Sequence, residues 1–161
     1  MTTGRIGTGL VVAWLIVWAC GCSTTPPAAS ADRGVVDPRD IAGQLRAAVA
    51  PWEGTPHQWG GNDRRGIDCS GLVVQIYREL FGYRLPRTTA ALSKIGRPVA
   101  PGRLAAGDLV FFRLADGKRH VGIYLDRGQF AHASSRQGVT ISRLDEHYWQ
   151  ETYWTARRLL S

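Results

Sequence analysis

The sequence predicts an α+β domain in which N-terminal helices pack on a mostly antiparallel sheet of five to six strands. Two observations carry this prediction. Apolar residues recur at helical spacing before Pro101, whereas short β-rich runs separated by turn residues follow it. Helices followed by a run of neighbouring strands are typical of the α+β class, because an alternating order of strands and helices would favour a parallel sheet.

Three helices are expected before Pro101, and each has a start or stop signal. Asp37 offers an N-cap and Pro38 a proline at the first helical position of the first helix, which Pro51 ends. Gly82 and Gly96 end the second and third helices, because glycine readily adopts the left-handed conformation that closes a helix. The expected bounds are 37–50, 69–81 and 88–95.

Five strands are expected after Pro101, and the second and third form a hairpin around a three-residue loop, Asp126-Arg127-Gly128. In that register residue 122 lies opposite residue 132, so His120 and His132 share one sheet face as diagonal neighbours. A slip of one residue would put the two histidines on opposite faces. The apolar residues between them face a core on the other side. The expected strands are 109–113, 120–125, 129–134, 139–143 and 153–158.

The composition is that of one globular domain with a basic surface. The chain has 161 residues, 44% of them hydrophobic, which excludes disordered and collagen-like proteins. Its 20 Lys and Arg against 13 Asp and Glu give a net charge of +7, which suits an anionic partner such as nucleic acid, anionic lipid or an acidic cell-wall polymer. Because the basic residues are spread along the chain with no run longer than a pair, we expect no nucleic-acid binding. Three cysteines are too few for a disulfide scaffold.

Residues 1–21 are typical of a secretory signal peptide. Arg5 precedes a nine-residue apolar run, Leu10 to Trp18, and small residues follow it. This run is shorter than the about 20 apolar residues that span a bilayer. We expect cleavage before Cys22 and lipid attachment at Cys22, because the small residue Gly21 precedes it as in a bacterial lipobox. The alternative is an uncleaved anchor or a buried first strand.

Residues 22–36 include two prolines and lack apolar periodicity, which predicts a flexible tether between the lipid and a domain at 37–161. Acyl chains at Cys22 would hold the protein at a bacterial membrane. Ser23 stands where an aspartate is associated with inner-membrane retention. We therefore expect a monomer anchored at the periplasmic face of the outer membrane.

Cys69 is the candidate nucleophile. Once the signal peptide is removed and Cys22 is acylated, Cys69 is the one free thiol, and an unpaired cysteine is unusual in an exported protein. Cys69 lies at the expected start of a helix after a glycine-rich loop, where helix N–H groups and the helix dipole favour the thiolate and lower the thiol pKa. The alternative is a small buried core residue.

The two histidines of the hairpin complete a set for nucleophilic catalysis. His120 would take the proton of Cys69 and later protonate the leaving amine, while His132 would hold the second ring nitrogen of His120. Two alternatives are open: the histidines only hydrogen-bond within the sheet, or His57, Cys69, His120 and His132 bind zinc. No pair of these residues has the short spacing of common zinc motifs, so we expect no metal and no cofactor.

Seven segments, taken together in their order, resemble the NlpC-type cell-wall cysteine peptidases, most closely the small lipoprotein members. The resemblance implies a papain-like fold, a catalytic triad of Cys69, His120 and His132, and hydrolysis of stem peptides or crosslinks in peptidoglycan. It also implies that Asp68 and Ser70 help to bind the substrate. The resemblance extends over nearly all of the chain from 37 to 160, and the segments are 54–61, 65–71, 85–88, 107–112, 120–124, 130–134 and 148–149.

One position departs from the family pattern. His57 stands where members usually carry a tyrosine whose hydroxyl assists at the oxyanion. A neutral imidazole N–H can also donate to an oxyanion, so we expect His57 to line the site. The departure favours an alternative, a catalytically weak or inactive murein-binding module of the same fold. Arg87, in Leu-Pro-Arg-Thr, either braces a loop or lines the cleft.

Overall fold

The computed structural model describes residues 40–160. The predicted signal peptide (1–21), the lipidation site Cys22, the tether (22–36) and the first three residues of the predicted domain lie outside the described residues. Within residues 40–160, no helix has both the length and the apolar character needed to cross a membrane.

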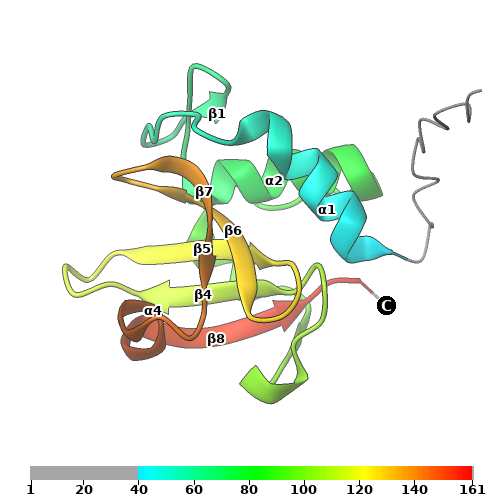
Figure 1. Ribbon diagram of the computed structural model, residues 1–161, viewed down its shortest axis with the longest axis vertical. Helices are drawn as coiled ribbons and strands as arrows, with labels where there is room; N and C mark the ends of the chain where they lie inside the picture. The colour runs from blue at the N-terminus through cyan, green and yellow to red at the C-terminus, as the bar shows by residue number, and fades with distance from the viewer. Residues whose placement is uncertain (1–39, 161) are drawn as a thin grey trace, which may run out of the picture. The chain divides into compact units, whose positions relative to one another are not determined.

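Helices cover both faces of a six-stranded sheet (Figure 1). On one face α2 (Cys69–Phe81) packs on β5 and β6, and α1 (Ile41–Val49) packs on α2. On the other face the short α4 (His147–Thr152) packs on β4. The strand order is β3-β8-β4-β5-β6-β7, and all neighbouring strands are antiparallel. The strands of this sheet are β3 (Arg97–Pro98), β4 (Leu109–Arg113), β5 (Arg119–Tyr124), β6 (Gln129–Ser134), β7 (Gly138–Arg143) and β8 (Tyr153–Arg158).

Short elements connect these layers. A two-stranded antiparallel ribbon, β1 (Asn62–Asp63) with β2 (Gly66–Ile67), leads directly into α2. After α2, α3 (Thr89–Leu92) lies close to β5 and α2. Single 3-10 turns, η1 (Ala50–Trp52) and η2 (Pro101–Arg103), follow α1 and β3. The predicted α+β class is therefore confirmed, and the main sheet has six strands, the larger of the two predicted numbers.

Two apolar clusters lie on opposite faces of the sheet. Val121 and Ile123 of β5 belong to the cluster beneath α1 and α2. The smaller cluster on the other face includes Phe112, Phe130 and Trp149. The alternation predicted for β5 is thus confirmed, because its apolar residues face the helical side. Its histidine faces the aromatic side, where its ring lies 6.3 Å from that of Phe112.

Several predicted boundaries are wrong, and those of the first and third helices are wrong for a local reason. The first helix begins at Ile41, because Oδ1 of Asp40 accepts the N–H of Gly43 at 2.9 Å and makes Asp40 the N-cap in place of Asp37. The third helix is four residues long, because the N–H groups of Lys94 and Ile95 bond to carbonyls three residues back as in a 3-10 turn. β5 spans 119–124 and β7 begins one residue early, at 138.

Candidate active site

Asp68 fixes the start of α2 and with it the position of Cys69. Its carboxylate accepts the backbone N–H of Gly71 at 2.7 Å, as an N-cap, and that of Gly60 at 2.8 Å. The second bond ties the glycine-rich loop to the helix. Gly71 has to be a glycine here, because a Cβ at this position would lie 2.6 Å from the carbonyl oxygen of Gly61. The N-cap Asp68 and the close approach of Gly71 to the backbone of Gly61 therefore fix the thiol in the first turn of the helix.

Arg87 braces this loop. Its Nη1 donates to Asp68 at 2.7 Å and to the hydroxyl of Ser70 at 2.9 Å, and its Nη2 donates to the carbonyl of Gly61 at 2.6 Å. Burial alone would raise the pKa of Asp68, but the hydrogen bonds from Arg87 and the loop hold it below the usual value. Asp68 and Ser70 are both buried, and neither is among the residues that line the groove described below. Their geometry gives them a supporting role, and substrate contact by either stays a prediction.

The thiol of Cys69 is nearly enclosed, with 8% of the residue exposed. Its Sγ lies 3.6 Å from Oγ1 of Thr89, the first residue of α3. Burial raises the pKa of the thiol, and it outweighs the opposing hydrogen bonds from Thr89 and from the backbone. The expectation that the helix start lowers this pKa is therefore wrong, because packing against β5 removes the water that would stabilise a thiolate.

His120 and His132 form a hydrogen-bonded pair on one face of the sheet. Nε2 of His120 lies 2.9 Å from Nδ1 of His132. The pairs Ile123–Ala131 and Tyr124–Phe130 have the predicted register, so the shared face of the two histidines is confirmed. Because Nε2 of His120 is used in this bond, Nδ1 is the nitrogen of that ring that can accept the thiol proton.

Aromatic rings enclose the histidine pair. Trp149 of α4 stacks on His120, with ring centroids 5.7 Å apart, and meets His132 edge-on at 4.9 Å. Phe130 stacks on His132 at 4.9 Å. Burial, and to a lesser degree the charge of His57, lowers the pKa of His120 to about 4, while burial and the charge of His120 lower that of His132 to about 3. Both rings are therefore neutral at pH 7 and able to accept a proton.

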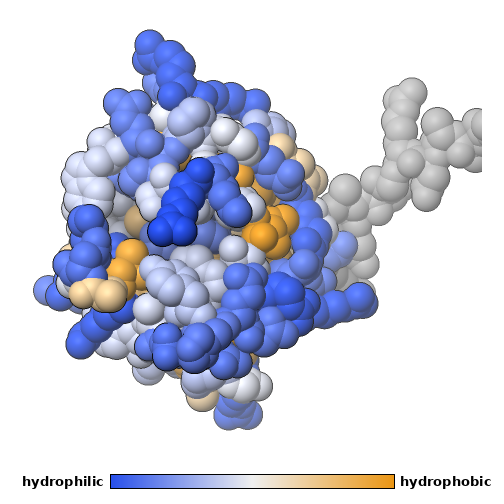
Figure 2. Space-filling view, turned by 60° about the vertical axis from the view of Figure 1, so that its left-hand side comes forward, coloured by the Kyte–Doolittle hydropathy of each residue, from blue (hydrophilic) through white to orange (hydrophobic). Residues whose placement is uncertain are grey.

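A groove of about 720 Å³ brings the predicted catalytic residues together. Cys69, His120 and His132 line it, as does His57, whose backbone pairs with Ile67 beside the start of α2. The groove walls come from the loop before α2 that contains His57 and Trp59, from the β4–β5 and β6–β7 loops, and from α4. His57 thus lies in the same groove as Cys69, and its role at the oxyanion stays a prediction. The face turned forward in Figure 2 is mostly hydrophilic, with small separate hydrophobic areas.

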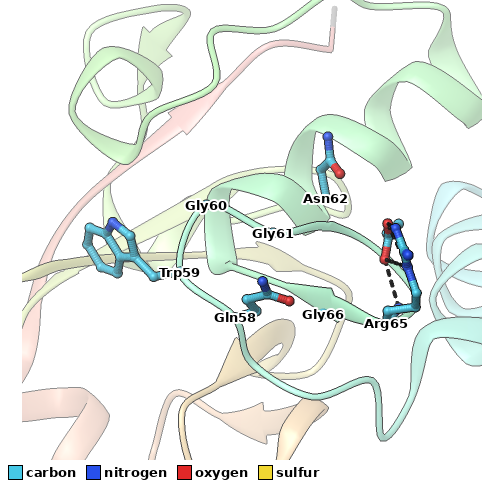
Figure 3. A pocket seen from close by; sticks show the side chains of 8 residues that line it. Gln58, Trp59, Gly60, Gly61, Asn62, Arg65 and Gly66 are labelled. Carbon is cyan, nitrogen blue, oxygen red and sulfur yellow. Dashed lines mark hydrogen bonds and ion pairs between the residues drawn. The ribbon is translucent and has the colours of Figure 1, made fainter.

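A second, shallower pocket of about 480 Å³ lies over the β1–β2 ribbon (Figure 3). Trp59, which is 77% exposed, lines both this pocket and the groove, and its indole points away from the Asp63–Arg65 ion pair at the other end. The two hollows therefore adjoin at Trp59.

The zinc alternative is not supported by the geometry. Among residues 40–160, no three side chains of His, Cys, Asp or Glu come together in a way that could hold a metal ion. Two of the proposed ligands, His120 and His132, use facing nitrogens for a bond to each other.

Two residues of the site were not singled out from the sequence. Thr89 contacts the thiol, and Oγ of Ser142 on β7 lies 3.0 Å from Nε2 of His132. No spacing or motif signal marked either one, because both reach the site through tertiary packing of separate elements.

Comparisons with known proteins agree with this geometry. The NlpC/P60 family matches residues 54–158 of the chain. Over 145 residues the chain is 42% identical to the murein DD-endopeptidase MepS/murein LD-carboxypeptidase of Escherichia coli K12, covering 89% of this chain and 77% of the relative. Over 152 residues it is 40% identical to the probable endopeptidase NlpC of the same organism, covering 93% of this chain and 97% of that one.

A solved structure shows the same fold. The crystal structure of an NlpC/P60 family protein from Bacillus cereus matches with a TM-score of 0.67 and 33% identity, over 74% of this chain and 40% of that chain. The family match covers more than half of the chain and includes the thiol and both histidines. This chain belongs to the NlpC/P60 family.

Proposed function

We propose that this protein is a cysteine endopeptidase that hydrolyses peptide bonds in the stem peptides or crosslinks of bacterial peptidoglycan. The observation that carries the proposal is one groove lined by a thiol in the first turn of a helix and by a hydrogen-bonded histidine pair. The relatives named murein endopeptidase and probable endopeptidase support peptidoglycan as the substrate.

The proposed reaction starts from a neutral thiol and a neutral imidazole. As Sγ of Cys69 attacks the scissile carbonyl carbon, Nδ1 of His120 takes the thiol proton, and the carbonyl oxygen becomes an oxyanion. The C–N bond then breaks, and His120 gives its proton to the leaving amine. Water attacks the thioester with His120 again as the base, which releases the carboxylate and restores the thiol. One water molecule is consumed for each bond cut.

His57 and His132 assist His120 and the oxyanion in this proposal. His132 accepts the Nε2–H of His120 and holds its ring while the imidazolium forms. His57 lines the same groove and offers a ring N–H to the oxyanion. A His57→Ala variant with unchanged turnover would remove His57 from this scheme.

A lipid anchor would hold the enzyme close to its substrate. We propose acylation at Cys22 and a periplasmic position at the outer membrane, on the short apolar run and small residues that precede this cysteine. Intact-mass analysis of the full chain from membranes tests the site. Cys22→Ser should abolish the lipid mass, while Cys20→Ser should leave it unchanged; the opposite pattern would move the site to Cys20.

Defined muropeptides test the catalytic proposal. Crosslinked and free muropeptides are incubated with the wild-type protein and with Cys69→Ala, and the products are identified by mass spectrometry. The wild type should yield new amine and carboxylate termini at one peptide bond, and Cys69→Ala should yield none. Equal cleavage by both would refute the nucleophile. Saturable binding to murein sacculi without cleavage would support the binding-module alternative.

A further inference from the structure

Ser142 occupies the far end of the histidine pair. It lies on β7, paired with Phe130 of β6, and its Oγ is 3.0 Å from Nε2 of His132. The other ring nitrogen of His132 is bonded to His120. His132 thus has a polar partner at both nitrogens, and the three side chains form one continuous hydrogen-bonded row that lines the groove.

Ring packing alone cannot decide which way His132 faces. Phe130 lies against one face of the imidazole at an interplanar angle of 27°, and Trp149 meets it edge-on, so its plane is fixed. A half-turn about the Cβ–Cγ bond keeps this plane but exchanges each ring nitrogen with a carbon. Only the polar partners at the two nitrogens oppose that half-turn. With Ser142 present the half-turn breaks two hydrogen bonds, and without it only one.

The proton positions along the row follow from the role of His120. A base must keep Nδ1 free of a proton, so its proton resides on Nε2 and is donated to Nδ1 of His132. His132 then carries its own proton on Nε2, and Oγ of Ser142 accepts it. After His120 takes the thiol proton, the same arrangement has to persist, because the Nε2–H of an imidazolium can only donate.

We propose that Ser142 is a positioning residue that holds His132 in the ring orientation and tautomer from which it accepts the Nε2–H of His120. This inference rests on the proposed function, in which His120 is the base. Ser142 acts through His132 and does not meet the reacting atoms. The hydrogen-bonded row is present in the resting protein, so part of the test needs no substrate.

A matched pair of variants isolates the hydroxyl. Ser142→Thr and Ser142→Val have side chains of nearly equal shape that differ in the hydroxyl alone, and both are β-branched residues that suit a strand. Ser142→Ala deletes the hydroxyl without adding volume and answers the same question should valine disturb β7. Imidazole ¹⁵N spectra of the full-length resting proteins report the tautomer of His132, and turnover of crosslinked muropeptides reports kcat and KM separately.

The expected result is a hydroxyl-dependent change. His132 should carry its proton on Nε2 in the wild type and in Ser142→Thr, and lose that single tautomer in Ser142→Val and Ser142→Ala. Losing one hydrogen bond of ordinary strength should lower kcat by about tenfold with KM unchanged, and threonine should restore kcat to within about threefold. An unchanged His132 tautomer in both variants that lack the hydroxyl would overturn the proposal, as would equal losses of kcat in threonine and valine variants. If wild-type protein cleaves no muropeptide, the proposed function fails, while the spectra still decide the role of Ser142.

Discussion

The resting enzyme should hold Cys69 as a neutral thiol, and the reactivity of that thiol at different pH values tests this. The thiol pKa is raised above an ordinary 9.0, and that of His120 is lowered to about 4. Moving the proton from sulfur to imidazole therefore spans at least 9 minus 4, or five, pH units, which corresponds to about 7 kcal/mol. At that cost about one molecule in a hundred thousand, or fewer, holds the ion pair, so the neutral thiol and the neutral imidazole predominate.

The assay is alkylation of Cys69 by iodoacetamide between pH 4 and pH 9, followed on the Cys69 peptide by mass spectrometry so that other cysteines do not contribute. Since only the thiolate reacts, the rate should rise about tenfold per pH unit up to pH 8, without a lower plateau. The protein unfolded in urea serves as the control and should react faster than the folded protein at each pH. A flat rate between pH 5 and pH 7 would show a preformed thiolate–imidazolium pair and would refute the reasoning.

Three further predictions concern the groups around this pair. Thr89→Val removes the hydroxyl that contacts the thiol and should slow alkylation at pH 8 by about two- to tenfold, with Thr89→Ser close to wild type; equal rates for valine and serine variants would exclude a role for the hydroxyl. Lysine cannot make the hydrogen bonds by which Arg87 holds Asp68, Ser70 and the carbonyl of Gly61. Arg87→Lys should therefore lower the free energy of unfolding in urea by about 1–3 kcal/mol. An unchanged urea midpoint of unfolding would mean that these hydrogen bonds do not stabilise the protein. The pKa of His120 falls from 6.5 to about 4 on folding, so the unfolded chain takes up this proton at a higher pH than the folded protein does. The free energy of unfolding should therefore decrease as the pH drops below 6.5, and His120 alone should lower it by about 2 kcal/mol between pH 7 and pH 5. A melting temperature that stays constant over that range would contradict the burial of a neutral histidine.

The parts of the fold that the sequence predicted well are those with strong local signals. α2 has the predicted bounds because a capping aspartate precedes it and Gly82, with φ of +68°, closes it. The β5–β6 register follows from its short loop, in which Gly128 has a φ of +78°, and from the alternation of apolar residues on β5. The short loop and the apolar alternation of β5 together predicted that His120 and His132 lie on one face of the sheet.

The parts that the sequence did not predict depend on short elements or on distant contacts. β1, β2 and β3 have two residues each and α4 has six, too few for a periodic pattern. Asp37 was predicted as the N-cap of α1, whereas the hydrogen bond from the N–H of Gly43 makes Asp40 the cap. The direction of the Cys69 pKa shift depends on how completely α2 and β5 exclude water, which residue spacing does not report. The signal peptide, the tether and acylation of Cys22 stay predictions.

The most direct test of the central claim is active-site labelling by a stem-peptide analogue that carries a chloromethyl ketone in place of the scissile amide, because the thiol sulfur displaces chloride and forms a stable thioether. Our account predicts one adduct per chain, located on the Cys69 peptide, with labelling slowed by excess muropeptide and abolished by Cys69→Ala. Adducts on other residues, or labelling of Cys69 that muropeptides do not slow, would contradict the claim that this thiol and its histidine pair form a peptidoglycan-cleaving site.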